Sequence, residues 1–167
     1  EDGLPDQLCQ QSGRNPLQKN SLQRWRLAST MNLTIYKEGI PMTELIQRIL
    51  PTVQKPARYT GGEFNEIKKD LNDVRVRVAF CFPDTYEIGM SNVGMRILYG
   101  VMNEMPGVWC ERVFAPWDDM EAAMRKNHLP LWALESGSPV KDFDMIAFTI
   151  GYEMCYTNIL NTLRLTG

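Results

Sequence analysis

Three short stretches of the sequence combine carboxylates, aromatic rings and glycine. They are residues 83–89 (Pro-Asp-Thr-Tyr-Glu-Ile-Gly), 115–118 (Ala-Pro-Trp-Asp) and 151–154 (Gly-Tyr-Glu-Met). Carboxylate oxygens accept hydrogen bonds from a ligand, and aromatic rings offer it flat apolar surfaces. Together the stretches have the composition of a small-molecule pocket. Taken singly, each side chain could instead cap a helix or cover the edge of a sheet.

A predicted strand precedes each of these stretches. In residues 74–82 valine and phenylalanine alternate with other residues, and residues 108–114 and 145–150 form two further apolar runs. Short apolar runs bounded by Pro, Gly or Asp predict strands of a sheet that is covered on both faces. Residues 131–134 are a candidate for a short extra strand.

Helical patterns lie before, between and after the strands. Residues 43–50 predict a short amphipathic helix that Pro51 ends, and residues 157–165 predict a final helix with Gly167 as its C-cap. We expect a second helix with its apolar side toward the sheet, formed by Ile97, Leu98, Val101, Met102 and Met105. We expect the same of a third helix, through Met120, Ala123 and Met124.

Polar residues in front of the second and third helices can cap them. Ser91 or Asn92 can accept a hydrogen bond from the first turn of the second helix. Asp118 or Asp119 can do so for the third helix.

Alternating strands and helices predict an α/β fold with right-handed parallel crossovers. We expect an open, mostly parallel sheet with helices on both faces, of the flavodoxin-like or Rossmann-like kind. A complete sheet of this kind has about five strands, so we expect a truncated sheet with an exposed edge. Ligands bind such sheets outside the carboxyl ends of the strands, where the three polar stretches lie.

We divide the chain into three regions. Residues 1–41 are polar and predict a disordered or non-native leader. A purine-rich ribosome-binding sequence read in frame encodes Lys-Glu-Gly, which is the sequence of residues 37–39. Met42 is therefore a candidate for the natural start, with residues 1–41 translated from upstream DNA. The alternative is an ordinary polar leader. Residues 42–73 hold the first helix and a linker with Gly and Pro, and residues 74–167 form the partial α/β domain.

Composition limits the classes of partner. The chain has 167 residues, 44% of them hydrophobic, and a net charge of −2. These values suit one domain with a real core and give no attraction to nucleic acid or to an anionic membrane. No apolar run approaches the roughly 18 residues of a membrane span, and the N-terminus lacks the apolar centre of a secretory signal. We therefore expect a cytoplasmic protein.

The cysteines and the single histidine do not predict a metal site. Cys9, Cys81, Cys110 and Cys155 are far apart and form no C-x-x-C pair, so we expect neither zinc nor disulfides. The second and third of them lie in apolar strands, where a thiol is a small hydrophobe. His128 follows the third helix, which places it at the sheet edge opposite the polar stretches.

Glycines could bring the backbone close to a phosphate in two places. Gly89 and Gly94 lack the tight pair of a G-x-G-x-x-G motif, which argues against a stand-alone nucleotide or flavin binder. A second group combines glycines with cations and forms either a phosphate or domain contact or an ordinary turn: Lys55, Arg58, Gly61 and Gly62.

Several irregular motifs occur in the order found in one protein family. Residues 84–89 resemble the Asp-x-His-x-x-Gly loop of cobalamin-binding domains, with Tyr86 in the His position. The resemblance extends over roughly residues 42–167 and is to bacterial radical SAM proteins with an N-terminal cobalamin-binding-like domain. It is carried further by residues 55–63, 80–94, 111–117 and 134–137.

The resemblance implies a radical SAM barrel elsewhere in the full-length chain. In such proteins a C-x-x-x-C-x-x-C motif in the barrel binds a four-iron, four-sulfur cluster, which reduces S-adenosylmethionine and releases a 5′-deoxyadenosyl radical. None of the cysteines of this chain has that spacing. We therefore assign no catalytic residue and no metal ligand to this chain, and expect it to be inactive alone.

The resemblance also implies a cobalamin site, but without a protein imidazole on cobalt. Tyr86 is a poor replacement for the His, because a phenol has a reference pKa near 10. The strands that hold the nucleotide tail of cobalamin would follow residue 167, so we expect weak binding or none by this chain alone. The candidate cofactor-binding residues are Asp84, Tyr86, Glu87, Gly89, Ser91, Asn92, Trp117, Gly151, Tyr152 and Glu153.

The predicted fold and the resemblance lead to two alternative hypotheses of function. The first is the N-terminal accessory domain of a radical SAM enzyme, which positions cobalamin or substrate beside the barrel. The second is a degenerate α/β scaffold that has lost its cofactor and acts as an interaction module. In the second case Trp109, Trp117 and Trp132 would partly mark an interface, although such tryptophans commonly pack in a core.

Overall fold

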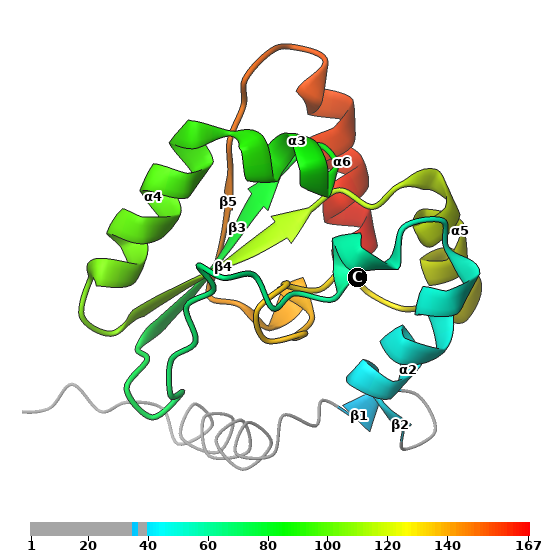
Figure 1. The fold of residues 1–167 in the computed structure, drawn as a ribbon, viewed down its shortest axis with the longest axis horizontal. Helices are drawn as coiled ribbons and strands as arrows, with labels where there is room; N and C mark the ends of the chain where they lie inside the picture. The colour runs from blue at the N-terminus through cyan, green and yellow to red at the C-terminus, as the bar shows by residue number, and fades with distance from the viewer. Residues whose placement is uncertain (1–34, 37–39) are drawn as a thin grey trace, which may run out of the picture.

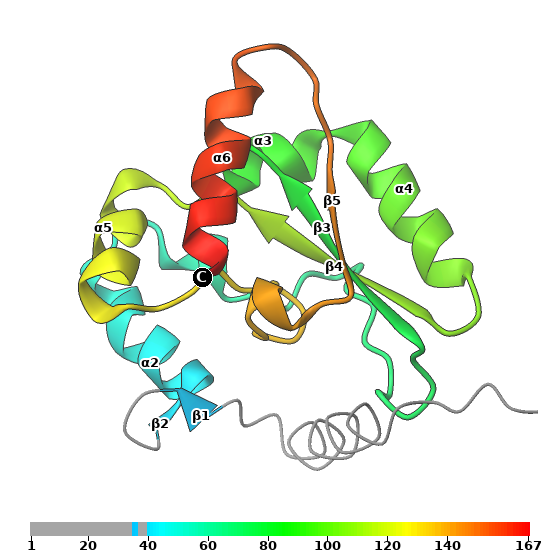
Figure 2. The same ribbon diagram turned by 180° about the vertical axis from the view of Figure 1, so that it is seen from behind.

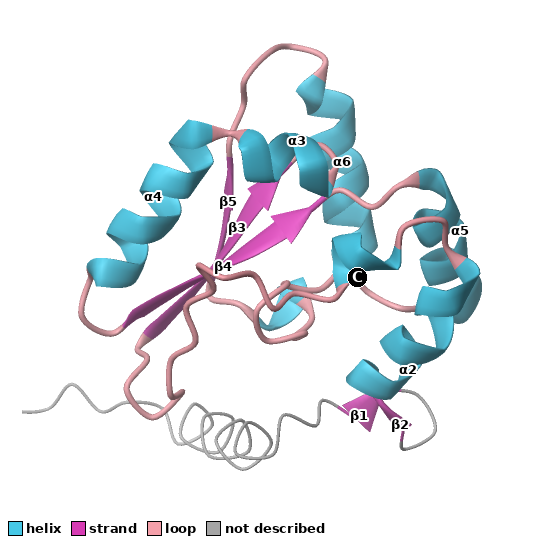
Figure 3. Cartoon of the chain, viewed as in Figure 1, coloured by secondary structure: helices cyan, strands magenta, loops and turns pink. Residues whose placement is uncertain are grey.

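The computed structural model describes residues 35–36 and 40–167, and the rest of the predicted leader lies outside the described residues. The secondary structure is drawn in Figures 1 and 3. In chain order the elements are β1 (Ile35–Tyr36), β2 (Ile40–Pro41), α2 (Met42–Ile49), η1 (Leu50–Thr52), η2 (Pro56–Tyr59), β3 (Val76–Phe82), α3 (Tyr86–Ser91), α4 (Val93–Glu104), β4 (Val108–Phe114), α5 (Asp118–Asn127), η3 (Val140–Asp142), β5 (Met145–Phe148) and α6 (Cys155–Thr166).

The main sheet has three parallel strands in the order β4-β3-β5. β3 pairs with β4 along its whole length, from Val76 opposite Val108 to Phe82 opposite Phe114, and with β5 over a shorter stretch. Parallel pairing follows because a helix lies in each connection and returns the chain to the same end of the sheet. The predicted open α/β sheet is confirmed. β1 and β2 form a separate antiparallel pair.

Helices cover both faces of the sheet. α3 and α6 lie on opposite sides, as the two views in Figures 1 and 2 show. On the α3 side, Met95 and Tyr99 of α4 pack in one cluster with Val78, Phe80 and Cys110 of the sheet. None of the helices in the described residues has the length and apolar character needed to cross a lipid bilayer.

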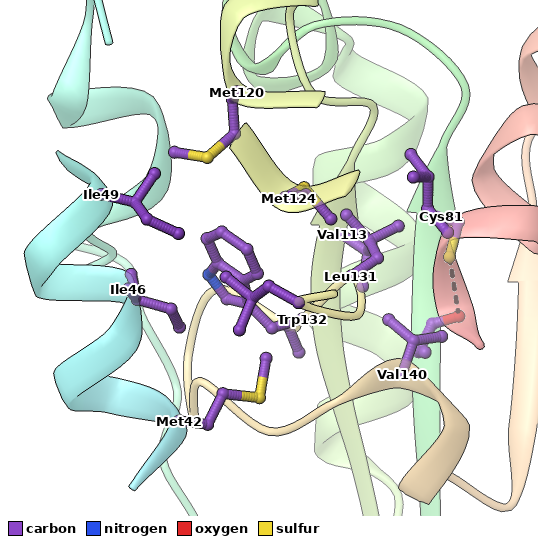
Figure 4. Packing of buried hydrophobic residues seen from close by; sticks show 14 of the residues in the cluster. Met42, Ile46, Ile49, Cys81, Val113, Met120, Met124, Leu131, Trp132 and Val140 are labelled. Atoms are coloured by element: carbon purple, nitrogen blue, oxygen red, sulfur yellow. Dashed lines mark hydrogen bonds between the residues drawn. The ribbon is translucent and has the colours of Figure 1, made fainter. Parts of the chain in front are cut away.

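The larger core lies on the other face, and α2 belongs to it. Figure 4 shows Ile46 and Ile49 of α2 pointing toward Trp132, with Met120 and Met124 of α5 beside them. Both methionines are fully buried, as predicted for the third helix. α2 therefore shares its core with the sheet, although a long irregular segment separates the two in sequence.

The predicted caps hold for one helix and fail for the other. The Asn92 side chain accepts a hydrogen bond from the first turn of α4 at 2.9 Å, as expected. The prediction for α5 is wrong, because Trp117 is its N-cap and both Asp118 and Asp119 lie in its first turn. Asp119 Oδ2 instead accepts from the Gln54 backbone N–H at 2.7 Å. The two carboxylates still favour the helix, since its N-terminus carries partial positive charge.

Two further expectations about local structure are wrong. Residues 131–134 form no strand but a loop that folds back on itself, with a single antiparallel bridge between Trp132 and Pro139. The polar stretch after β3 is not all loop, since helix α3 begins within it at Tyr86. Both errors come from short segments, in which tertiary contacts outweigh local pattern.

α4 also presents a different face to the sheet from the one predicted. Of the five side chains expected to face inward, only Met102 packs against the core. The other four are each about half exposed: Ile97, Leu98, Val101 and Met105.

Hydrogen bonds explain this orientation of α4. The Asn103 side chain accepts from the Cys110 N–H at 3.0 Å and donates to the Cys110 carbonyl at 2.9 Å, so it pairs with the outer edge of β4. The Tyr99 hydroxyl accepts from the Ile67 N–H at 2.8 Å. Buried backbone groups need such partners, and aliphatic side chains cannot supply them.

The orientation of α4 can be tested by truncating one side chain on each face. In this 167-residue chain, Met95→Ala should lower the free energy of unfolding by about 2–4 kcal/mol, because it empties a buried site. Ile97→Ala should change it by less than about 1 kcal/mol, because its side chain is exposed. Urea denaturation measures both values. A larger loss for Ile97→Ala would contradict this orientation.

Candidate functional site

The three polar stretches meet at the carboxyl edge of the sheet, as parallel strands require. Hydrogen bonds tie the first stretch to its neighbours on both sides. The Ala115 N–H donates to the Asp84 carbonyl at 3.0 Å, and Asn158 Nδ2 of α6 donates to the Pro83 carbonyl at 2.9 Å. The stretch after β3 is therefore bonded to the stretch after β4 and to helix α6, which follows the third stretch.

Asp84 and Tyr152 form the open polar part of this edge. The Tyr152 hydroxyl donates to Asp84 Oδ2 at 3.5 Å, a long hydrogen bond, and Asp84 Oδ1 accepts from the Thr85 N–H at 2.7 Å. These residues follow β3 and β5, and the chain leaves β3 for β4 on one side before returning to β5 on the other. This is the topological switch point, where doubly wound sheets bind ligands.

The surroundings of this pair suit a small molecule. Space is open beside Gly151, where an added Cβ would meet no atom within 4 Å, and Glu153 is exposed. Exposed apolar side chains are contributed by Ile88 of α3 and, in the loop after β5, by Ile150 and Met154. Polar groups among exposed apolar ones are typical of a binding site. We call Asp84, Gly151, Tyr152 and Glu153 the switch-point group.

Tyr86 does not join the switch-point group. Its hydroxyl donates to Glu63 Oε1 at 2.9 Å, and its ring packs edge-on against Phe114 at 5.4 Å between centroids. Burial and the hydrogen bond to Glu63 raise the pKa of Tyr86 above its ordinary value. The phenol is therefore neutral and already engaged, which does not fit a cobalt ligand.

Glu87 and Trp117 belong to a second cluster. In it, both residues contact the segment of residues 55–59, which precedes β3. Glu87 accepts from Arg58 Nε at 2.9 Å and from Lys55 Nζ at 3.3 Å. The Arg58 guanidinium lies 5.3 Å from the centre of the Trp117 ring, and the Trp117 N–H donates to the Tyr59 hydroxyl at 3.1 Å. The cations of the predicted phosphate or domain contact thus bind a carboxylate of the chain itself.

The remaining predicted site residues shape the backbone. Gly89 lies directly beneath Phe114, and a Cβ there would overlap the ring. The Ser91 hydroxyl donates to the Ile88 carbonyl at 2.8 Å, and Asn92 caps α4. The structure therefore brings only the switch-point group together as an open site.

A buried ionic network that was not among the predicted site residues lies behind the site. The Arg112 side chain is 3% exposed and donates to Glu135 Oε1 at 2.6 Å, while Glu135 Oε2 accepts from the Arg112 backbone N–H at 2.7 Å. Arg112 also lies 3.4 Å from Glu63, the partner of Tyr86. Its guanidinium stacks 4.5 Å from the Tyr99 ring. Charges inside an apolar strand were the available signal, because a buried charge needs a partner.

A second ion pair lies on the opposite face of β4. The Glu111 side chain is fully buried and accepts from Arg77 of β3 at 2.6 Å and from the Ser136 N–H at 3.1 Å. Residues 135 and 136 are therefore held by β4 from both sides. The loop that covers the outer edge of β4 depends on both ion pairs.

The turn formed by Gly61 and Gly62 places Glu63 beside Arg112. Substitutions of the two glycines can test how much stability depends on this turn. Gly61 and Gly62 both have positive φ, but only at Gly61 would a Cβ meet a backbone atom, the Leu134 oxygen at 2.5 Å. Gly62→Ala should cost about 1–2 kcal/mol of strain. Gly61→Ala should cost clearly more, about 3 kcal/mol or above, because the clash adds to the same strain. Thermal denaturation of both variants compares them, and equal losses would show that the close approach is unimportant.

The buried carboxyl of Glu135 predicts a pH dependence of stability. Burial raises its pKa to about 7, against the opposing effect of Arg112. Between its ordinary pKa of about 4.3 and this value, the folded protein holds a proton that the unfolded chain does not. The free energy of unfolding should therefore fall as the pH rises through this window.

The variant Glu135→Gln isolates that contribution. Melting temperatures measured between about pH 5 and 7.5 should fall less steeply with pH in Glu135→Gln than in the unchanged protein. Glu104→Gln, at an exposed position of α4, serves as the control and should keep the original slope. An unchanged slope in Glu135→Gln would assign the pH dependence to other groups.

The described residues do not fit a metal centre. They contain no group of three or more His, Cys, Asp or Glu side chains that could hold a metal ion. Cys81 and Cys110 lie on opposite faces of the sheet, and burial raises the pKa of each thiol to about 12. Thiolates are the ligands of an iron–sulfur cluster, so these two cysteines do not fit one. His128 is the C-cap of α5, far along that helix from the carboxyl edge, as predicted.

Comparison with known proteins gives one match. Residues 94–167 match the family model described as radical SAM proteins, N-terminal. No curated protein and no solved structure matches the chain. The matched part runs from α4 to α6 and includes three of the four residues of the switch-point group. Residues 94–167 of this chain are therefore similar to the N-terminal region of radical SAM proteins.

Proposed function

We propose that this chain is the N-terminal accessory domain of a cytoplasmic radical SAM enzyme. Its switch-point group positions cobalamin or substrate beside the radical SAM domain. The observation that carries the proposal is the open Asp84–Tyr152 pair at the switch point of the sheet. The match of residues 94–167 adds support. In the full-length protein, S-adenosylmethionine and an iron–sulfur cluster supply the radical.

The switch-point group favours ligands with hydrogen-bond donors. Asp84 and Glu153 carry negative charge, and the nearby cations Lys55 and Arg58 are bound to Glu87. Amides and hydroxyls are therefore better partners than phosphates. Asp84 Oδ2 can accept a ligand N–H or O–H at small cost, because its bond to Tyr152 is long. The exposed Tyr152 ring can cover a flat apolar face of the ligand.

This arrangement suits cobalamin only without a protein ligand to cobalt. The corrin ring of cobalamin presents a flat conjugated surface and carries amide groups at its periphery, which match the ring of Tyr152 and the carboxylate of Asp84. Tyr86 keeps its proton and its bond to Glu63. His128 lies at the wrong end of α5. We therefore expect no imidazole of this domain on cobalt.

Titration of hydroxocobalamin, followed by absorbance, tests the proposal. We expect binding by the full-length protein, and weaker binding or none by this 167-residue chain. Asp84→Ala and Tyr152→Ala should each weaken binding by about 5- to 10-fold, through loss of one polar or aromatic contact. His128→Ala is the matched control and should change neither the affinity nor the spectrum.

The other outcomes are equally informative. A spectrum that changes in His128→Ala would contradict the absence of a protein imidazole on cobalt. Absence of binding by a folded full-length protein would exclude cobalamin as the ligand. In that case, the KM for the substrate would be measured for Asp84→Ala and Tyr152→Ala. Normal KM values in Asp84→Ala and Tyr152→Ala would remove the switch-point group from function.

The alternative function is a scaffold that has lost its cofactor and serves as an interaction module. It is favoured by the internal bonds of Tyr86 and Glu87, which leave fewer groups for a ligand. The tryptophans give it little support. Trp109 and Trp132 are buried in the core, and Trp117 alone among the three is exposed.

A further inference from the structure

α4 lies at an outer side of the molecule, at the end opposite to α5 in both views of the fold (Figures 1 and 2). Its inner face packs on the sheet through Met95 and Tyr99. Its outer face exposes an apolar stripe formed by Val93, Ile97, Leu98, Val101 and Met105. A contiguous exposed patch of this kind is typical of a surface that binds another protein.

Four of these side chains form a ridge that is symmetric about the middle of the helix. They follow one another at intervals of four residues, which places them on one side of the helix: Val93, Ile97, Val101 and Met105. The centre of the series is Tyr99. An antiparallel copy of the helix placed against this ridge brings Val93 opposite Met105 of the second copy, and Ile97 opposite Val101 of the second copy.

Two opposite charges share this symmetry. Arg96 near the start of α4 and Glu104 at its end are both exposed. They are too far apart to pair with each other, because helical ion pairs join residues three or four apart. Among the described residues neither has an ion-pair partner. Their midpoint lies next to the centre of the ridge, so in an antiparallel pair Arg96 of each copy lies near Glu104 of the other.

The midpoint between the two charges is Gly100, where the described chain does not require a glycine. An added Cβ would meet no atom within 4 Å, and φ at this position is not positive. Glycine inside a helix lowers its stability relative to alanine. Without a side chain, however, the backbone of a second helix can come close. The position of Gly100 therefore fits the crossing point of two helices.

The exposed stripe of α6 lacks this symmetry. It consists of Tyr156, Leu160 and Leu163, and the helix has a single charged residue, Arg164. Nothing on α6 therefore complements a second copy of the same helix. The outer face of α4, in contrast, is complementary to itself in both its apolar ridge and its charges.

From this self-complementarity we infer that α4 is a self-association surface, through which two copies of the chain form an antiparallel dimer about a twofold axis. In a twofold contact the same surface serves both copies, so a residue i that meets j is matched by a residue j that meets i. Another protein, or another segment of the same polypeptide, would not require a symmetric surface. The inference does not depend on which molecule the switch-point group binds.

The extent of the stripe indicates a weak dimer. Two stripes of half-exposed side chains would together bury on the order of 1,000 Å², which is at the lower end of specific interfaces. We therefore expect association on the order of tens of micromolar and above. At a few micromolar the chain is monomeric, and the outer face of α4 is then exposed to solvent.

Sedimentation velocity of the full-length protein tests the association. Between about 5 and 500 µM the average sedimentation coefficient should rise from that of a monomer toward that of a dimer. Ile97→Asp should weaken the association at least about 30-fold, because it places a charge in an apolar contact. Lys126→Glu, at an exposed position of α5, is the control and should change the dissociation constant by less than about 2-fold.

Charge reversal distinguishes a second copy from any other occupant. Arg96→Glu and Glu104→Arg each bring like charges together at both ends of the dimer, and each should weaken it by about 10-fold. An equimolar mixture of the two variants pairs opposite charges at both ends. Mixed dimers should therefore form with an affinity within about 3-fold of that of the unchanged protein. A fluorescent label on one variant lets sedimentation detect the mixed dimer.

Three results would overturn the inference. The first is a full-length protein that stays monomeric over the whole concentration range. The second is a dimer with the same dissociation constant in Ile97→Asp and in Lys126→Glu, since another surface would then join the copies. The third is a mixture of the two charge variants that associates no more tightly than either variant alone. None of these results bears on the cobalamin titration.

Discussion

β4 carries two adjacent charges into the interior, and the arrangement of the site depends on how they are neutralised. Glu111 and Arg112 point to opposite faces of the strand, and both side chains are almost completely buried. A buried charge without a partner costs several kcal/mol, so each must find one. Arg77 of β3 pairs with Glu111, and Glu135 from the loop after α5 pairs with Arg112. These pairs fix β4 against β3 and hold the loop on its outer edge.

The same constraint reaches the candidate site through Glu63. This carboxylate lies between Arg112 and the Tyr86 hydroxyl, so it connects the buried network to the first residue of α3. Tyr86 is thereby turned inward, away from Asp84 and Tyr152. In the segment after β3, Tyr86 thus bonds to the interior, whereas Asp84 lies at the switch point and is open to a ligand. Burying these charged groups costs free energy of desolvation. Their hydrogen bonds and ion pairs give the loop one defined shape.

Polarity in this domain is distributed differently on its two sides. The interior around β4 contains charged side chains, whereas α4, α6 and β5 present apolar side chains to solvent. The charges specify how the central strands and the loops fit together.

The sequence by itself determined the kind of fold and its order of elements. Short apolar strands, separated by helical patterns, leave few alternatives to a parallel α/β sheet, and β4 was predicted with its observed bounds. The convergence of the polar stretches at one edge followed from the same topology. Tertiary structure alone decided which face of α4 is buried, because Asn103 bonds the backbone of β4 and Tyr99 bonds the distant Ile67, and periodicity cannot show either contact. It also decided that Tyr86 turns toward Glu63, since that contact joins residues 23 positions apart through a glycine turn and an ion pair. Local pattern records the preference of a segment for helix or strand, whereas the choice of partner depends on every charge and backbone group that folding buries.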